Sequence, residues 1–133
     1  ISPYYRGSDC NFWALYDNNY HLVGSTIHRL TAGLDNGPIL FHAICEKNSD
    51  LFDYTMLSVK AAIISLKENI KNKEILKMKE QKINPLKLIR YSKTKDFNDK
   101  IIKSFFKKKI DFKKKNYNLL KNPFVLKKDK FFN

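Results

Sequence analysis

The sequence predicts an α/β domain in which two strands, joined by a tight loop, precede one long amphipathic helix. The first strand is expected at His21 to Leu30, where β-branched and apolar residues are frequent, and the second from Pro38 to Cys45. The loop between them contains two glycines and an asparagine, which readily adopt the positive φ angles of tight turns. Asp35 lies in this loop, and we expect its carboxylate to be held on a fixed backbone beside a ligand.

Two helices are predicted on either side of the strand pair. A short helix covers Cys10 to Tyr16, and a long one runs from Leu51 to about Asn72 after an N-cap at Ser49 or Asp50. The long helix has apolar residues spaced three or four apart, and this stripe is expected to pack against a sheet or another helix. The stripe consists of Phe52, Met56, Val59, Ile63, Leu66 and Ile70.

The break at Asn84-Pro85 predicts two parts of the chain. Residues 1–84 form the domain that contains the candidate site, and residues 85–133 form a basic tail of helical and irregular structure. Within the tail, residues 86–91 are a candidate edge strand and residues 96–110 a candidate helix. From Lys107 onward, lysine triplets alternate with Phe, Tyr and Leu.

Positive charge is concentrated in the second part of the chain. The net charge is +13, yet residues 1–48 carry three Lys/Arg against four Asp/Glu, and residues 49–133 carry 23 against nine. Basic runs with interleaved aromatics suit a nucleic acid, whereas the scarcity of Ala, Gly, Pro and Arg also fits the compositional bias of an AT-rich genome. Arg90 is the one arginine of this part, although the arginine guanidinium binds phosphate with better geometry than the lysine ammonium does.

Length and cysteine content favour a single soluble domain. The 133 residues show no signal-peptide pattern and no apolar run near the roughly 18 residues that span a bilayer. We therefore expect a cytoplasmic protein, or part of one, with no membrane contact. Cys10 and Cys45 have no metal-ligand spacing, so no metal site is expected, and reduced thiols are favoured over a disulfide.

Four short motifs occur in order in the first part of the chain: Ser2-Pro3-Tyr4-Tyr5-Arg6-Gly7, Asn11-Phe12-Trp13-Ala14-Leu15, Gly24-Ser25-Thr26-Ile27-His28 and Gly33-Leu34-Asp35-Asn36-Gly37-Pro38-Ile39-Leu40. Together they resemble the formyltransferase family, which includes methionyl-tRNA, glycinamide ribonucleotide and sugar-amine formyltransferases. The resemblance covers residues 1–45 well and extends loosely to residue 72. It implies the second half of an open, Rossmann-like formyltransferase sheet.

The resemblance implies transfer of a formyl group from 10-formyltetrahydrofolate to a primary amine. Asp35 takes the place of the family's catalytic aspartate, and His28 that of a second histidine which several members place near it. Four loop residues become candidate folate contacts: Thr31, Ala32, Gly33 and Leu34. Five others form the substrate loop: Pro3, Tyr4, Tyr5, Arg6 and Gly7.

The chemistry suits a carboxylate held in a loop. An amine that attacks a formyl carbon must lose a proton, and the tetrahedral oxyanion needs hydrogen-bond donors. By spacing, the family's Asn and main catalytic His would stand before Ile1, as would its amino-terminal strand-and-helix half. The resemblance therefore implies that this chain is the carboxy-terminal portion of the catalytic domain and that it is inactive alone.

Structural interpretations stand beside these functional ones. Asp35 fits an ordinary Asp-Asn-Gly turn, His28 a hydrogen-bonded strand position, and the loop tyrosines simple packing. For the acceptor, a small-molecule amine such as a nucleotide-linked amino sugar is favoured over methionyl-tRNA, because the residues after Pro85 are too few for that enzyme's barrel-like domain. A non-catalytic, basic nucleic-acid-binding module is the third hypothesis. A tRNA partner and a homodimer both stay open.

Overall fold

The computed structural model describes residues 1–33, 35–110, 112 and 119–132, and these form a mixed α/β fold. The elements, in chain order, are β1 (Tyr5–Gly7), α1 (Cys10–Tyr16), β2 (Ser25–His28), β3 (Ile39–Cys45), α2 (Leu51–Lys71), β4 (Arg90–Ser92), α3 (Asp99–Phe106) and β5 (Phe124–Leu126), with short 3-10 turns between them. The expected α/β class is confirmed at this level, whereas the Rossmann-like assignment stays a prediction.

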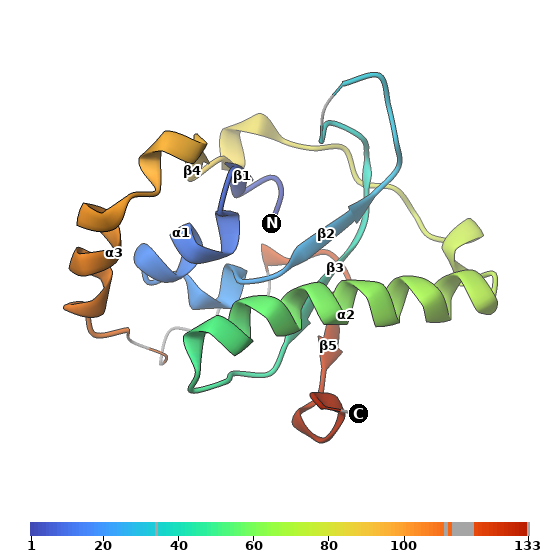
Figure 1. Cartoon of the computed structure of the whole chain (residues 1–133). Coiled ribbons are helices and arrows are strands. Elements are labelled where there is room, and N and C mark those ends of the chain that lie inside the picture. The colour runs from blue at the N-terminus through green and yellow to red at the C-terminus, as the bar shows by residue number, and fades with distance from the viewer. Residues whose placement is uncertain (34, 111, 113–118, 133) are drawn as a thin grey trace.

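The strand β3 is the centre of the structure. It pairs antiparallel with β2 and parallel with β5, and all seven of its residues are buried. A second, two-stranded sheet pairs β1 with β4 in parallel. The long helix α2 packs across β3, β2 and β5, whereas α1 and α3 lie at the end of the molecule where α2 begins (Figure 1). The hairpin loop between β2 and β3 extends away from α2 (Figure 1).

The first predicted strand is shorter than expected. Residues 20–22 form a buried 3-10 turn, and only Ser25–His28 pair as β2. Tyr20 fixes this turn, because its side chain is buried and its hydroxyl donates to the Phe112 carbonyl at 2.6 Å. The second predicted strand is confirmed from Ile39 to Cys45.

The helix α2 is confirmed in extent and in its Asp50 cap, which accepts from the Asp53 amide at 2.9 Å, but the expected packing face is wrong. The buried residues of α2 are Tyr54, Leu57, Ser58, Ala61 and Ser65, whereas most of the predicted stripe is exposed. The physical reason is close approach. Ala61 and the two serines let the helix axis lie near the strands, and both hydroxyls are satisfied by helix carbonyls three residues back.

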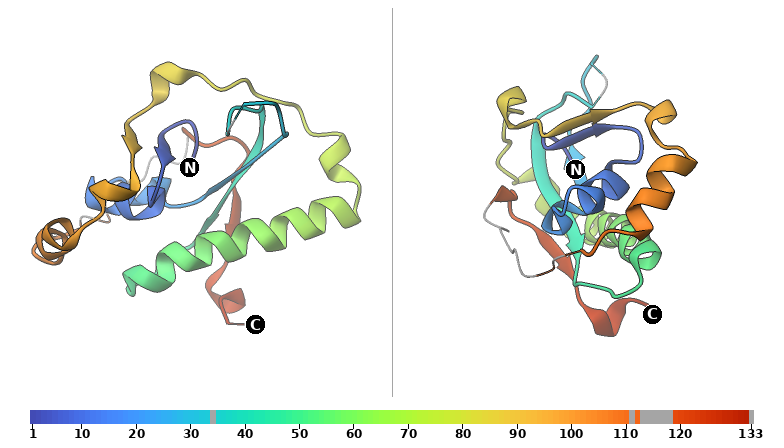
Figure 2. Two further views of the ribbon diagram at one scale, coloured as in Figure 1. Left: turned by 45° about the horizontal axis from the view of Figure 1, so that its top comes forward. Right: turned by 90° about the vertical axis from the view of Figure 1, so that its left-hand side faces the viewer.

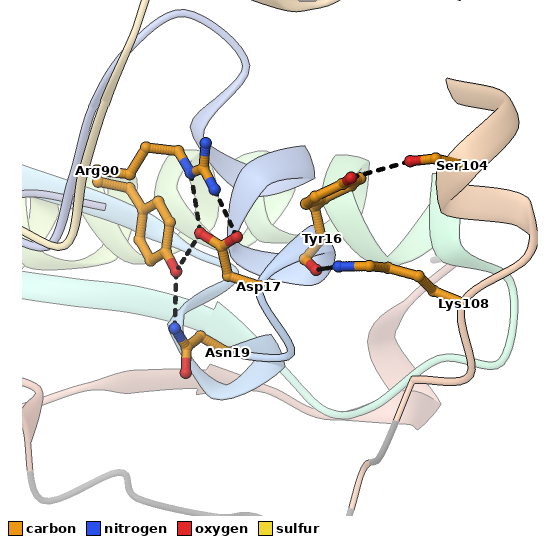
Figure 3. A network of polar contacts seen from close by, with 7 residues as sticks. Tyr16, Asp17, Asn19, Arg90, Ser104 and Lys108 are labelled. Atoms are coloured by element: carbon orange, nitrogen blue, oxygen red, sulfur yellow. Dashed lines mark hydrogen bonds and ion pairs between the residues drawn. The ribbon is translucent and has the colours of Figure 1, made fainter. Parts of the chain in front are cut away.

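The residues after Pro85 are joined to the first part of the chain. Arg90 forms a two-pronged ion pair with Asp17, with nitrogen–oxygen distances of 2.6 and 2.9 Å (Figure 3). Its guanidinium lies 4.4 Å from the Trp13 ring. Lys108 donates to the Tyr16 carbonyl at 2.7 Å, and the Tyr16 and Ser104 hydroxyls are 2.9 Å apart (Figure 3). Figure 2 shows β4 beside β1 and β5 beside β3. The proposed boundary at residue 84 stays a prediction.

Two predicted tail elements are confirmed in part. The candidate edge strand is a 3-10 turn at Pro85–Lys87 followed by β4, and the candidate helix is limited to α3, which is capped by Asn98. Phe105 of α3 is buried against α1, whereas Phe106 is exposed.

Among the described residues, no helix combines the length and apolar character needed to cross a bilayer.

Candidate functional site

The candidate site is the loop that joins β2 to β3. The pairing of the two strands shifts by one residue between Ile27 and His28, and the Arg29 amide then donates to the Pro38 carbonyl at 3.1 Å. Gly37 is required at the loop's end, because a Cβ there would lie 1.6 Å from the Arg29 carbonyl oxygen. The sequence thus closes the loop through a position that only glycine fits.

Asp35 and His28 come together in this loop. The carboxylate Oδ1 lies 3.8 Å from Nε2 of His28, and the other ring nitrogen lies 3.1 Å from the Arg29 carbonyl. The two side chains differ in exposure: His28 is 19 % exposed and Asp35 is 64 % exposed. Asp35 has a φ of +48°, which a loop aspartate tolerates better than most residues. The carboxylate is therefore accessible and has an imidazole beside it.

The start of the chain lies within electrostatic reach of Asp35. Burial lowers the pKa of the Ile1 amino group, and the Asp35 carboxylate partly opposes that lowering. Two hydrogen bonds fix the following residue: the Ser2 carbonyl accepts from Thr26 Oγ1 at 3.1 Å and lies 2.9 Å from Nε2 of His42. The hairpin strands thus hold the chain that leads into the Pro3 loop.

His42 joins three segments of the chain. It is buried on β3, and its Nδ1 accepts from the Lys121 amide at 2.8 Å while Nε2 faces the Ser2 carbonyl. Both contacts require the neutral ring with its proton on Nε2. Burial lowers the pKa of His42 and therefore also favours the neutral ring. The available signal was its position in an otherwise apolar strand, where a buried polar side chain must be hydrogen-bonded.

The predicted substrate loop divides into a buried and an accessible part. Pro3, Tyr4 and Tyr5 are buried; the Tyr4 hydroxyl donates to the Leu119 carbonyl at 2.6 Å. Burial raises the pKa of Tyr5 to about 12, and this hydroxyl donates to Asp17 while it accepts from Asn19. The tyrosines therefore act as packing residues in this structure.

Arg6 and Gly7 form the accessible part of that loop. Arg6 is half-buried in β1, opposite Tyr91 of β4, and Gly7 is exposed. Gly7 has a φ of +94°, and a Cβ there would lie 1.9 Å from the Ser92 carbonyl oxygen. The close approach of β4 therefore explains this glycine without a ligand.

The candidate folate contacts lie on the exposed side of the hairpin loop. Thr31, Ala32 and Gly33 are exposed, so their backbone groups are accessible to a flat, polar ring. The fourth candidate, Leu34, lies outside the described residues. Their role as folate contacts stays a prediction.

One cavity borders the site and a larger one lies away from it, and neither is lined by Asp35. One, of about 310 Å³, lies between β2 and α2 and is lined by His28, Leu30 and Ile63 among others. A larger, apolar one of about 620 Å³ lies between α1, α2 and α3 and reaches Gly7 and Gly24. Its walls are mainly aromatic and aliphatic, and it lacks the imidazole and carboxylate pair, so we assign the chemistry to the hairpin loop instead.

The cysteines take no part in the candidate site. Both thiols are free, and burial raises the pKa of Cys10 and raises that of Cys45 to about 12, so neither is an activated nucleophile. Across the described residues, no three His, Cys, Asp or Glu side chains gather as metal ligands.

Family models, curated proteins and solved structures were compared with this chain, and none of them matches it.

Proposed function

We propose that this chain is the carboxy-terminal part of a folate-dependent formyltransferase catalytic domain and that it contributes the proton-handling carboxylate. The proposal rests on the motif resemblance together with one structural observation. Asp35 is 64 % exposed, and its Oδ1 lies 3.8 Å from Nε2 of His28. In the proposed enzyme, the catalytic Asn and His lie in residues that precede Ile1.

The proposed reaction moves a formyl group between two nitrogen atoms. The primary amine forms a bond to the formyl carbon, and the bond from that carbon to N10 of the folate breaks. The amine loses a proton during attack, and N10 gains one as it leaves. 10-Formyltetrahydrofolate supplies the one-carbon unit as a substrate.

Asp35 and His28 have separate tasks in this scheme. Asp35 accepts the proton of the amine, directly or through a water molecule, because its carboxylate is exposed on the surface of the loop. His28 orients that carboxylate from β2, at the 3.8 Å separation of Nε2 and Oδ1. The oxyanion donors come from the preceding Asn and His.

We propose a small-molecule amine, such as a nucleotide-linked amino sugar, as the acceptor in preference to methionyl-tRNA. Within the described residues after Pro85, β4 pairs with β1 and β5 pairs with β3. Both strands are therefore used to complete the first part of the chain and do not pair with each other as strands of a separate barrel would.

The direct experiment compares this chain with a longer protein. The 133-residue chain is expected to show no transfer from 10-formyltetrahydrofolate to amino sugars, because the oxyanion donors are absent. The same chain extended through an upstream Asn-x-His segment is expected to transfer the group, measured by the absorbance of the tetrahydrofolate product. Turnover by the 133 residues alone, or an inactive extended protein that is folded and binds folate, contradicts the proposal.

A further inference from the structure

The helix α2 has a continuous apolar surface that nothing in the described chain covers. We call it the outer strip; its residues are Phe52, Met56, Val59, Ile63 and Ile70, with exposed fractions of 73, 51, 43, 64 and 56 %. Leu66 lies on the same line and is half-buried. Solvent-facing positions of an ordinary surface helix are polar, so this run of apolar residues calls for a partner.

The outer strip points away from the sheet. Successive residues of an α-helix are turned by about 100°, so the strip residues fall within about 40° of one direction. On the same wheel, the buried residues Leu57, Ala61 and Ser65 lie on the opposite side. The helix is therefore apolar on two faces, of which one is used by the sheet and the other is free.

The exposed apolar surface of the strip and of the segment around α3 together approaches the size that a standard interface buries. The amino-terminal part of the strip borders the 620 Å³ cavity, whose opposite wall includes Phe97 and Phe106 of the segment around α3. With about 150–200 Å² for each large apolar side chain, the exposed fractions of the five strip residues give roughly 430–570 Å². Phe97 and Phe106, which are 38 and 81 % exposed, raise the total to roughly 600–800 Å². Monomers rarely expose a patch above about 600 Å², and a standard interface buries about 800 Å² per partner.

The spacing of the outer strip is the same in both directions along the helix. The intervals from Phe52 to Ile70, with Leu66 included, are four, three, four, three and four residues. Two antiparallel copies related by a two-fold axis level with Ala61 place Phe52 against Ile70, Met56 against Leu66, and Val59 against Ile63. A surface that matches itself in this way is the requirement for a two-fold interface.

The charges of α2 favour the same antiparallel arrangement. Its first turn carries Asp53 after the Asp50 cap, and its last turns carry Lys67 and Lys71. Asp53, Lys67 and Lys71 lie on one flank of the strip by the same helical geometry, so pairing in opposite directions brings acid beside base. Residues 50–71 carry three acids and three lysines, so the overall basicity of the chain does not oppose contact here.

We propose that the outer strip is the interface of a homodimer in which two α2 helices pack antiparallel. This inference is independent of the proposed formyl transfer, because it uses neither Asp35 nor the hairpin loop. The occupant is a second copy of this chain, since the strip is self-complementary in spacing and in charge.

The oligomeric state of the 133-residue chain tests the proposal. Sedimentation equilibrium at tens of micromolar is expected to give about twice the monomer mass of 15.7 kDa. Ile63→Glu places a charge next to the two-fold axis in both copies and is expected to raise the dimer dissociation constant at least about 100-fold. The matched control is Leu86→Glu, at a 92 % exposed position away from α2, which is expected to leave the constant within about three-fold.

Cross-linking tests the direction of pairing. In a Cys10→Ser background, a mixture of Phe52→Cys and Ile70→Cys chains is expected to form a mixed disulfide, whereas neither chain alone links to itself, since like positions lie about 27 Å apart. A monomeric parent chain overturns the proposal and assigns the strip to a different polypeptide or to residues that precede Ile1. An Ile63→Glu chain as dimeric as the parent, or self-linking of Phe52→Cys alone, overturns it as well.

Discussion

Replacing Asp35 by Asn in the extended, active protein is expected to lower kcat/KM for formyl transfer by about 10²–10⁴-fold. The amide has the same shape as the carboxylate but cannot accept the proton that the attacking amine loses. Asparagine also tolerates the positive φ of this position, so the loop conformation is expected to persist. The measurement is the initial rate over a range of amine concentrations, together with a circular dichroism spectrum.

Asp9→Asn is the matched control for that substitution. Asp9 is also exposed and has a φ of +54°, but it stands before α1 rather than in the hairpin loop. Its replacement is expected to leave kcat/KM within about three-fold. If Asp35→Asn retains the full rate, or if Asp9→Asn loses as much, Asp35 does not handle the proton and has only a turn-forming role.

The second large effect concerns the ion pair that joins the end of α1 to β4. Asp17→Ala is expected to lower the free energy of unfolding by about 2–3 kcal/mol, because it leaves the partly buried Arg90 guanidinium and the Tyr5 hydroxyl without their acceptor. The burial of both partners is incomplete, at 20 and 34 % exposure, which places the effect below that of a fully buried pair. Urea denaturation followed by circular dichroism measures the change.

Glu74→Ala provides the comparison for Asp17→Ala. Glu74 forms an ion pair with Lys77 at 2.9 Å, but both side chains are more than half exposed, so its loss is expected to cost under about 0.5 kcal/mol. Equal effects of the two substitutions would show that the Arg90 contact is no stronger than a surface pair. They would also show that β4 does not depend on it.

The fold was predictable where local patterns decide it. The long helix, its Asp50 cap and the second strand follow from periodicity and capping chemistry. The packing face of α2 was not predictable, because the larger apolar residues form the outer strip while Ala61 and two serines face the sheet. Hydrophobicity favours the face with the large apolar residues as the packing face. In the structure, the face with small side chains packs instead, because small side chains allow close contact between the helix and the sheet.

The strand pairing of the tail could not be predicted from the sequence. β4 and β5 are three residues each, and both pair with strands far away in the chain. Three-residue strands give no periodic signal, and their pairing is set by contacts such as Arg90 with Asp17.

The candidate site was predictable in part. The glycine at position 37 and the aspartate at position 35 indicate a closed loop with an accessible acid, and the structure brings His28 beside that acid. The burial of Tyr4 and Tyr5 was one of two alternatives that the sequence left open. Their hydroxyl partners lie at Leu119, Asp17 and Asn19, and no local spacing connects those positions.

The position of Asp35 relative to bound folate is the most direct test of the proposed function. A crystal structure of the extended protein with 5-formyltetrahydrofolate, a stable analogue of the donor, measures it. The proposal predicts that an Asp35 carboxylate oxygen lies within about 3–4 Å of the reacting groups or of one water molecule that bridges to them. A structure with folate bound elsewhere, and with Asp35 directed into solvent away from the Pro3 loop, contradicts it.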